Sequence, residues 1–258
     1  MKLKQINIDF NEKSHAYVVE GELYAGVTTI LDVRNKPFLK WWTAKEVVKF
    51  LEDKQEQIKS ATPEEYSKLL DEAKKAHVRK ADTAKDAGKI AHEYVEHYIG
   101  EKLGTKGALV MPENEEAVKA INAFLEWEKK HEIKWIFSEL KVASIKHKYA
   151  GTLDFVAVID GKFTLGDFKT NAQLSEDACL QTAGYWQALD ELSEEGETID
   201  MQRMVVRLPK DGKEAEEWII PTPIKFDVEI FNALRRVHSW NVNTENNLKG
   251  ENGKIKIN

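Results

Sequence analysis

Apolar and polar residues follow two different patterns along the chain, and the change falls near His131. Before this position apolar residues recur at helical spacing, which predicts helices over residues 37–53, 62–80, 84–99 and 113–131. After it, apolar and β-branched runs predict strands over residues 135–143, 149–159, 162–169, 199–208 and 215–220. Two further helices are expected over residues 175–192 and 227–242. This order predicts an α/β fold with a mixed central β-sheet flanked by helices.

The first part of the chain adds smaller elements to this core. Short strands are expected over residues 5–10, 15–19 and 22–24. A capping box, which marks a helix start, is predicted from Thr62 and Glu65. Because we find no internal repeat and no low-complexity linker, we expect a single domain over residues 1–258. Its parts are an N-terminal elaboration of strands and helices over 1–83, a core over 84–245 and a flexible tail over 246–258.

Two neighbouring predicted strands each carry an aspartate in an otherwise apolar setting. The run 153–159 is nearly all apolar, as in strands that are buried on both faces, yet Asp154 interrupts it. Asp160 and Gly161 give a strong hairpin-turn signal, so residues that pair across this hairpin have numbers that sum to about 321. This register places Asp154 opposite Asp167 on the next strand.

This pair of carboxylates predicts a metal site. Directly opposed like charges destabilise a sheet, and a divalent cation bound by both carboxylates is the simplest way to neutralise them. Lys169 lies two residues after Asp167 and therefore on the same face of the strand. A cation at that place can orient a water molecule or stabilise charge that builds on a phosphate. Asp154, Asp167, Lys169 and a metal ion together supply most of what phosphodiester hydrolysis requires.

The composition indicates which class of protein carries this candidate metal site. The chain has 258 residues, 42% apolar and 32% charged, as in soluble globular proteins. Its single cysteine, Cys179, excludes an internal disulfide and any four-thiolate zinc or iron–sulfur site. With no signal-peptide pattern and no apolar stretch of membrane-spanning length, we expect a cytoplasmic location. The net charge of −6 argues only mildly against a nucleic-acid partner, because a metal site for DNA hydrolysis itself requires carboxylates.

Several short motifs, in order, resemble one family. The segments Gly-Thr-Leu-Asp at 151–154 and Gly-Asp-Phe-Lys-Thr at 166–170 resemble the PD-(D/E)XK nuclease signature, in which an acidic residue precedes an acidic-x-Lys triplet across a β-hairpin. Gln181 and Tyr185 on the following predicted helix are similar to the Q-x-x-x-Y motif of the RecB-like branch. His92, four residues after a glycine, matches the helical histidine upstream in that branch. The resemblance covers roughly residues 88–185.

The resemblance implies a restriction-endonuclease-like core and a metal-dependent deoxyribonuclease that uses Mg²⁺ or Mn²⁺. It implies that the metal is held by His92, Asp154, Asp167 and the carbonyl of Phe168. Lys169 would position or activate a water molecule that attacks the phosphate in line and leaves a 5′-phosphate and a 3′-hydroxyl.

Further roles follow from the same resemblance. Gln181 and Tyr185 would brace the site or touch the DNA backbone, and Glu139 stands where the family often places a further acidic catalytic residue. With one cysteine, the chain lacks the iron–sulfur cluster of some members. It is thus similar to the stand-alone, phage-type exonucleases, which implies a bacterial or phage-infected host cell. The expected partners are single-stranded DNA or duplex ends, together with a recombination or replication protein.

Alternatives remain at this stage. The same core serves structure-specific and restriction-like endonucleases, and a degenerate nuclease fold can act as a non-catalytic DNA-binding module. Taken alone, His92 is better explained as a structural histidine than as a metal ligand, and Glu139 is equally explained as a surface carboxylate. Gln181 and Tyr185 could likewise be ordinary helix surface and core. The tryptophans are expected in the core, although Trp41 and Trp42 are adjacent on a predicted helix and cannot both face it.

Overall fold

The computed structural model describes all residues except Met1, residues 12–15, Ala172, residues 195–199 and residues 250–258, and it describes residues 245–249 by their backbone only. Two compact units make up the chain. The first comprises Met1–Arg34 and Ala91–Asn258 and is called the sheet unit below. The second comprises Asn35–Ile90 and is called the helical unit.

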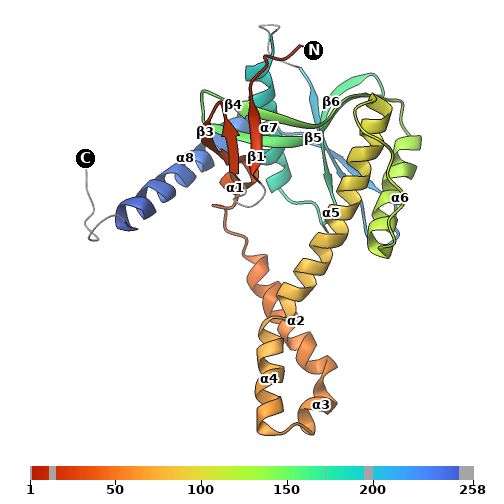
Figure 1. Cartoon of the computed structure of the whole chain (residues 1–258), viewed down its shortest axis with the longest axis vertical. Coiled ribbons are helices and arrows are strands. Elements are labelled where there is room, and N and C mark those ends of the chain that lie inside the picture. Colours follow the sequence, from red (N-terminus) through yellow and green to blue (C-terminus); the bar gives the residue numbers. More distant parts are fainter. Residues whose placement is uncertain (1, 12–15, 172, 195–199, 250–258) are drawn as a thin grey trace. The chain divides into compact units, whose positions relative to one another are not determined.

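Within its described residues, the sheet unit contains one eight-stranded sheet (Figure 1). Its strands are β1 (Ile8–Asn11), β2 (Ala16–Val19), β3 (Glu22–Gly26), β4 (Ile133–Ser144), β5 (Tyr149–Ile159), β6 (Lys162–Lys169), β7 (Gln202–Arg207) and β8 (Glu216–Ile219). The order is β1-β2-β3-β5-β6-β7-β8, and β4 pairs with β5. The β3–β5 and β6–β7 pairs are parallel and the others antiparallel, so the sheet is mixed, as predicted.

Strand β5 organises the sheet because it has three partners. β4 pairs along its whole length, from Ile133↔Ile159 to Ser144↔Tyr149. Consequently β3 and β6 must share the opposite edge of β5. β3 pairs there with Tyr149 and Ala150, whereas β6 pairs from Phe155 onward. Residues 151–154 therefore lie between two ladders on this edge, and we call this part of the strand the fork.

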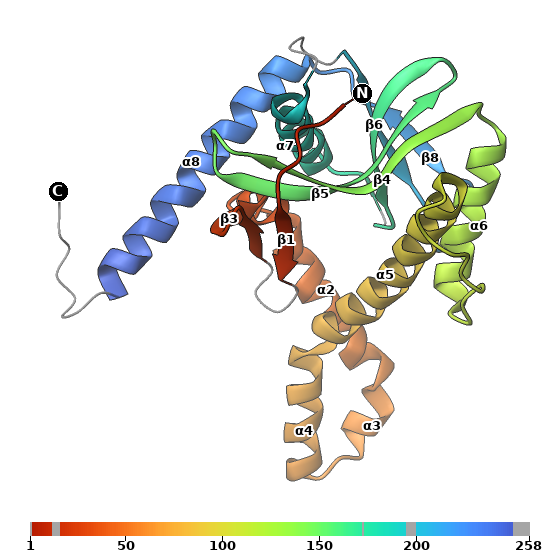
Figure 2. The ribbon, with the colours of Figure 1, turned by 45° about the horizontal axis from the view of Figure 1, so that its top comes forward.

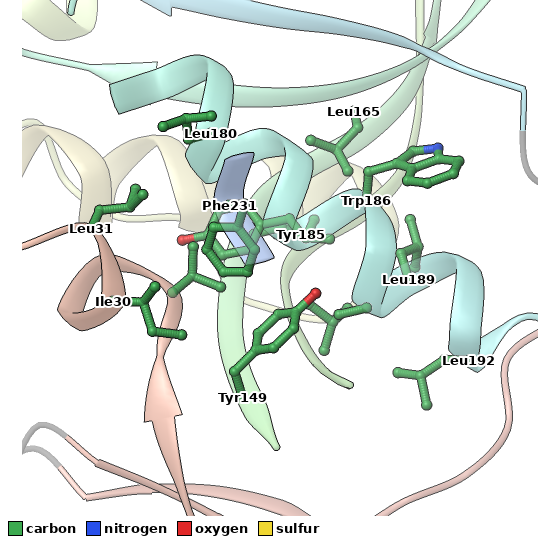
Figure 3. Packing of buried hydrophobic residues seen from close by; sticks show 14 of the residues in the cluster. Ile30, Leu31, Tyr149, Leu165, Leu180, Tyr185, Trp186, Leu189, Leu192 and Phe231 are labelled. Carbon is green, nitrogen blue, oxygen red and sulfur yellow. The ribbon is translucent and has the colours of Figure 1, made fainter. Parts of the chain in front are cut away.

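One face of the sheet is covered by three helices, α1 (Val27–Leu31), α7 (Asp177–Leu192) and α8 (Ile224–Lys249). Figure 3 shows the apolar side chains that these helices and β5 contribute to a common core. The Tyr149 hydroxyl donates to the carbonyl of Gly184 at 2.9 Å, and its ring packs edge-on against Phe231. Arg203 of β7 forms a buried ion pair of 2.6 Å with Asp227, which fixes α8 to the sheet.

The other face carries aromatic residues that pack against α6 (Glu115–Lys129). Phe124 of α6 lies edge-on to Phe168 of β6, with ring centroids 5.4 Å apart. Trp127 of α6 packs on the same phenylalanine, while Trp135 of β4 packs on Phe155 of β5. Both tryptophans are buried, as predicted.

The helical unit consists of helices α2 (Phe38–Asp53), α3 (Gln55–Lys59), α4 (Pro63–Lys74) and the first half of α5 (Ala76–Leu103). The capping box predicted at Thr62 is confirmed: the Glu65 amide donates to the Thr62 hydroxyl, and the Glu65 carboxylate accepts from the Thr62 amide at 2.8 Å. Trp42 packs edge-on against His77, whereas Trp41 is 79% exposed. The prediction that Trp41 belongs to the core is therefore wrong.

Two helices before His131 have boundaries that were predicted wrongly. The helix expected over 62–80 ends at Lys74, because Lys75 leaves the helical conformation. The helix expected over 84–99 instead extends from Ala76 to Leu103, through Gly100. A glycine inside a helix costs only about 1 kcal/mol, and here it has a packing role. The Gly100 carbonyl accepts from the amides of Thr105 and Lys106, and a side chain at Gly100 would meet that of Lys106.

Most of the remaining elements agree with prediction. The strands over 149–159 and 162–169 are confirmed at both ends, and α6, α7, β4, β7 and β8 differ from prediction by at most three residues at the ends that are described. The predicted first residues of two strands, His15 and Ile199, lie outside the described residues. Helix α8 continues to Lys249, so the predicted tail begins as helix, and its part over 250–258 also lies outside the described residues. No helix among the described residues is long and apolar enough to cross a membrane.

Candidate metal-dependent nuclease site

The predicted aspartates lie where β5 and β6 separate. The ladder between these strands has the predicted register, with pairs from Ile159↔Lys162 to Phe155↔Gly166. Asp154 and Asp167 are the next residues in that register. Instead of continuing the ladder, the Asp154 carboxylate accepts a hydrogen bond of 2.6 Å from the amide of Phe168. The fork and the end of the β6 ladder thus bring the two carboxylates together.

Asp167 has an unusual environment for a carboxylate. Its side chain is fully buried, and Lys169 Nζ lies 2.6 Å from its Oδ2 as an ion pair. Beyond this ion pair, neither carboxylate oxygen has a hydrogen-bond partner in the described part of the protein. A buried charged oxygen without its hydrogen bonds is costly. Asp167 therefore has unused capacity to bind a cation.

Lys169 is held by the following helix. Its ammonium donates to Gln181 Oε1 at 2.9 Å, and Gln181 Nε2 donates to the Tyr185 hydroxyl at 2.9 Å. Gln181 and Tyr185 lie one turn apart on α7, and both are buried. The ring of Tyr185 packs over Gly151, where a side chain would overlap it. The Gln and Tyr of the motif thus form one hydrogen-bonded chain that ends on Lys169.

His92 approaches the site from α5. Its Nδ1 lies 3.8 Å from Asp154 Oδ2, and its side chain is 34% exposed. Val95 and Ile99, which share its helical face, are buried, as predicted from the apolar stripe. Burial lowers the pKa of His92, partly offset by the charge of Asp167. A lowered pKa keeps the imidazole neutral, which is the form that binds a metal ion.

Glu139 also lies near these residues. It sits on β4 with a positive φ of 50°, between the pairs Ser138↔Phe155 and Leu140↔Leu153. Burial, together with the charges of Glu96 and Asp167 and against the opposing effect of Lys106, raises its pKa to about 7. Glu139 is therefore a partly buried carboxylate within the field of the site, not an ordinary surface residue.

Asp154 is affected both by burial and by the neighbouring carboxylates. Burial raises the pKa of this carboxyl well above its ordinary value, and the charges of Asp167 and Glu139 act in the same direction. Lys169 and the amide of Phe168 act in the opposite direction. Burial alone would lower the pKa of Lys169, but Asp167 and Asp154 hold it above its ordinary value, so the amine is charged. The cluster is short of positive charge, with one ammonium among three carboxylates.

The chemical types of the candidate ligand atoms suit a hard divalent cation, but their positions do not yet form a complete metal site. Asp154 and Asp167 offer carboxylate oxygens and His92 an imidazole nitrogen, a set that suits Mg²⁺ or Mn²⁺. Among the described residues, no three His, Cys, Asp or Glu side chains are close enough to hold a metal ion as they stand. The positive charge that faces Asp167 is the Lys169 ammonium. The ring of Phe168 points into the aromatic core, so a backbone group is all that Phe168 can offer.

Two residues around the site, Glu96 and Tyr17, were not proposed from the sequence. Glu96, one turn after His92 on α5, affects the pKa of both His92 and Glu139 and is paired with Lys106. The Tyr17 hydroxyl forms a hydrogen bond of 3.0 Å with Thr152 Oγ1 in the fork. Burial raises the pKa of Tyr17, with a further contribution from Glu139. The spacing from His92 could have indicated Glu96, whereas nothing local indicates Tyr17.

The structure thus brings together six of the predicted site residues by direct contacts: His92, Asp154, Asp167, Phe168, Lys169 and Gln181, with Tyr185 behind them and Glu139 coupled through its charge. Their assembly follows from the fold: α5, β4, β5, β6 and α7 each contribute at least one of them. Comparison of the chain with known families gives no matching family model, and no curated protein matches it.

Proposed function

We propose that the protein is a metal-dependent DNA nuclease of the PD-(D/E)XK superfamily, similar to its RecB-like and phage-type exonucleases. The observation that carries this proposal is the buried Asp167, whose oxygens have no partner among the described residues beyond the ion pair with Lys169. A purely structural ion pair in a core is normally completed by further hydrogen bonds. Here the unused acceptor capacity faces a second carboxylate and an imidazole.

The residues that would hold the metal are His92, Asp154 and Asp167, with the Phe168 carbonyl. Bound there, Mg²⁺ or Mn²⁺ supplies Lewis-acid polarisation of a phosphoryl oxygen and lowers the pKa of a bound water molecule. The protein supplies the negative charge that attracts the metal ion. Because Asp167 is fully buried, solvent does not screen its carboxylate. Burial also keeps competing water away from these oxygens, which strengthens their attraction for a cation.

Lys169 would place a proton donor beside the reacting phosphate. Its raised pKa keeps it charged at neutral pH, and Gln181 restricts the direction in which the ammonium points. A fixed cation that is already oriented stabilises developing charge without reorganisation. Tyr185 is buried and fixes Gln181 in turn, so it acts as a positioning residue.

The choice of single-stranded DNA rests on the helical unit. Residues 35–90 carry 13 Lys and Arg against 10 Asp and Glu, although the whole chain has a net charge of −6. The exposed rings of Phe38 and Trp41 share one face of α2 with Lys45. Exposed aromatic residues next to cations stack bases and hold phosphates in single-strand-binding proteins.

Cleavage by the purified full chain tests the proposal. With Mn²⁺ or Mg²⁺ it should degrade linear single-stranded DNA, and EDTA should stop the reaction. Asp167→Asn and Lys169→Ala should abolish cleavage, whereas Lys162→Ala, at the exposed start of the same strand, should not. If no DNA or RNA of any form is cleaved with either metal, the proposal fails.

Two alternative functions are separated by the same assay. A strict exonuclease leaves closed circular single strands intact, so cleavage of circles would indicate an endonuclease on the same core. Binding of DNA without cleavage by the wild-type protein would instead indicate a non-catalytic DNA-binding module. The intact set of Asp154, Asp167 and Lys169 favours catalysis, because a binding module gains nothing from a buried carboxylate that lacks hydrogen bonds.

A further inference from the structure

Helix α8 is apolar on two faces, but only one of them packs on the core. Phe231 is fully buried, and Ile224, Val228 and Leu234 are partly buried against the sheet unit. A second set of apolar residues is exposed: Phe226 by 55%, Ile230 by 39%, Val237 by 47% and Trp240 by 67%, with Ala233 exposed between them.

The exposed set has a regular spacing. Residues 226, 230, 233, 237 and 240 are separated by alternating steps of four and three, which is the spacing of the seam in a two-helix coiled coil. These steps keep the five residues in one stripe along four turns. Figure 2 shows that the C-terminal half of α8 extends away from the sheet. A continuous exposed apolar stripe of this kind marks an interaction surface.

The charges beside the stripe indicate what covers it. Glu229 and Arg236 directly precede the seam residues Ile230 and Val237, and both are exposed. Neither forms an ion pair within the described part of the chain. When two copies of α8 pair antiparallel, with Phe226 opposite Val237 and Ile230 opposite Ala233, the positions that flank the seam face each other. Glu229 of each copy then lies opposite Arg236 of the other, so the surface is complementary to itself.

We propose that α8 pairs antiparallel with α8 of a second copy of this chain, so that the protein is a homodimer. The two-fold symmetry follows from the self-complementary charges, since each copy presents the same patch to the other. A nucleic acid would require cations along the stripe, and the seam has none. The proposal does not depend on the nuclease activity, because no residue of the stripe belongs to the candidate site.

Two matched substitutions test the apolar seam. Val237 and Val242 are similarly exposed, at 47% and 44%, but Val242 lies on the other side of the helix. Light scattering on the full chain should give about twice the chain mass of 29.5 kDa. Val237→Glu should reduce the measured mass to that of one chain, and Val242→Glu should leave it doubled. A wild-type protein with the mass of one chain at every soluble concentration would overturn the proposal, as would equal effects of the two substitutions.

A charge exchange tests the antiparallel register. Glu229→Arg and Arg236→Glu should each place like charges opposite one another and weaken the dimer by about tenfold. The double variant restores opposite charges and should regain most of the affinity. Circular dichroism of each variant checks that the fold is retained. If the double variant is no tighter than the single ones, the antiparallel register is wrong. If the wild-type protein cleaves no nucleic acid, the proposed function fails, but the mass and affinity measurements still test the dimer.

Discussion

The ring of Phe155 fills the space that any side chain at position 166 would need. Phe155 and Gly166 form the last pair of the β5–β6 ladder, immediately before the two aspartates. Phe155 is fully buried and packs against Phe168 and Trp135, so it cannot move aside at low cost. The glycine of the Gly-Asp-x-Lys segment is therefore required by the packing of Phe155 at the last pair of the ladder.

Gly166→Ala should destabilise the protein by about 1–3 kcal/mol, because the added methyl group overpacks the core. The shift of Phe155 should also displace Phe168 and reduce cleavage. Urea unfolding measures the loss of stability. Gly107→Ala is a suitable control, since nothing lies near a side chain at that position, and it should change stability by less than about 0.5 kcal/mol. Equal losses for the two variants would contradict the role of Phe155.

Gln181→Ala should lower the rate of cleavage by about tenfold, because Lys169 loses the acceptor that orients its ammonium. The effect should fall on kcat with little change in KM, since Gln181 is buried. Gln173→Ala, an exposed glutamine before the same helix, serves as the control. A change confined to KM would show that Gln181 contacts the substrate instead of positioning Lys169.

The pH dependence of the free energy of unfolding should show the raised pKa of Glu139. Its pKa of about 7 in the folded protein lies above its ordinary value of 4.5, so the folded state binds the proton more tightly than the unfolded state does. Protonated Glu139 therefore contributes to the free energy of unfolding. This contribution is at most about 3 kcal/mol; it is fully present below about pH 4.5 and is lost as the pH rises through about 7. In EDTA, Glu139→Gln should remove this part of the pH dependence. A variant whose pH profile matches that of the wild type would refute the assignment.

Trp41→Ala should weaken the binding of single-stranded DNA by about 1–3 kcal/mol, the usual contribution of a base stacked on an aromatic ring. Fluorescence anisotropy with a labelled oligonucleotide, in Ca²⁺ or with Asp167→Asn to prevent cleavage, measures the affinity. Tyr66→Ala removes another exposed aromatic ring of the helical unit, on α4, and should have little effect. Unchanged affinity of Trp41→Ala would exclude it as a stacking platform.

Local patterns were enough to predict the hairpin that carries the two candidate aspartates. The turn at Asp160-Gly161 fixes the register, so the proximity of Asp154 and Asp167 follows from counting residues. The contact from Gln181 to Lys169 is also short in sequence. By contrast, His92 and Glu139 reach the site only through the packing of α5 and β4, and sequence spacing cannot predict such packing.

The exposure of some apolar residues could not be predicted from the sequence pattern, because it depends on which face of a helix is covered. Trp41 is apolar yet exposed, and α8 has a stripe that looks like core but lies outside it. The metal ion stays a prediction; Lys169, expected on the same face of the strand, forms an ion pair with Asp167 that the pattern did not indicate. Periodicity identifies apolar faces, but it does not say whether the chain itself covers them.

The fork has a consequence for how the protein is made. Its two branches come from distant parts of the chain: Ala25 of β3 pairs with Tyr149, 124 residues later, while Phe155 pairs with Gly166 only 11 residues away. Pairing between parallel strands so far apart in sequence is slow. On the ribosome, β3 must wait without its partner until the hairpin and α7 have emerged. Synthesis of most of the polypeptide therefore precedes assembly of the candidate site, so a nascent chain carries Asp154 and Asp167 before their surroundings exist.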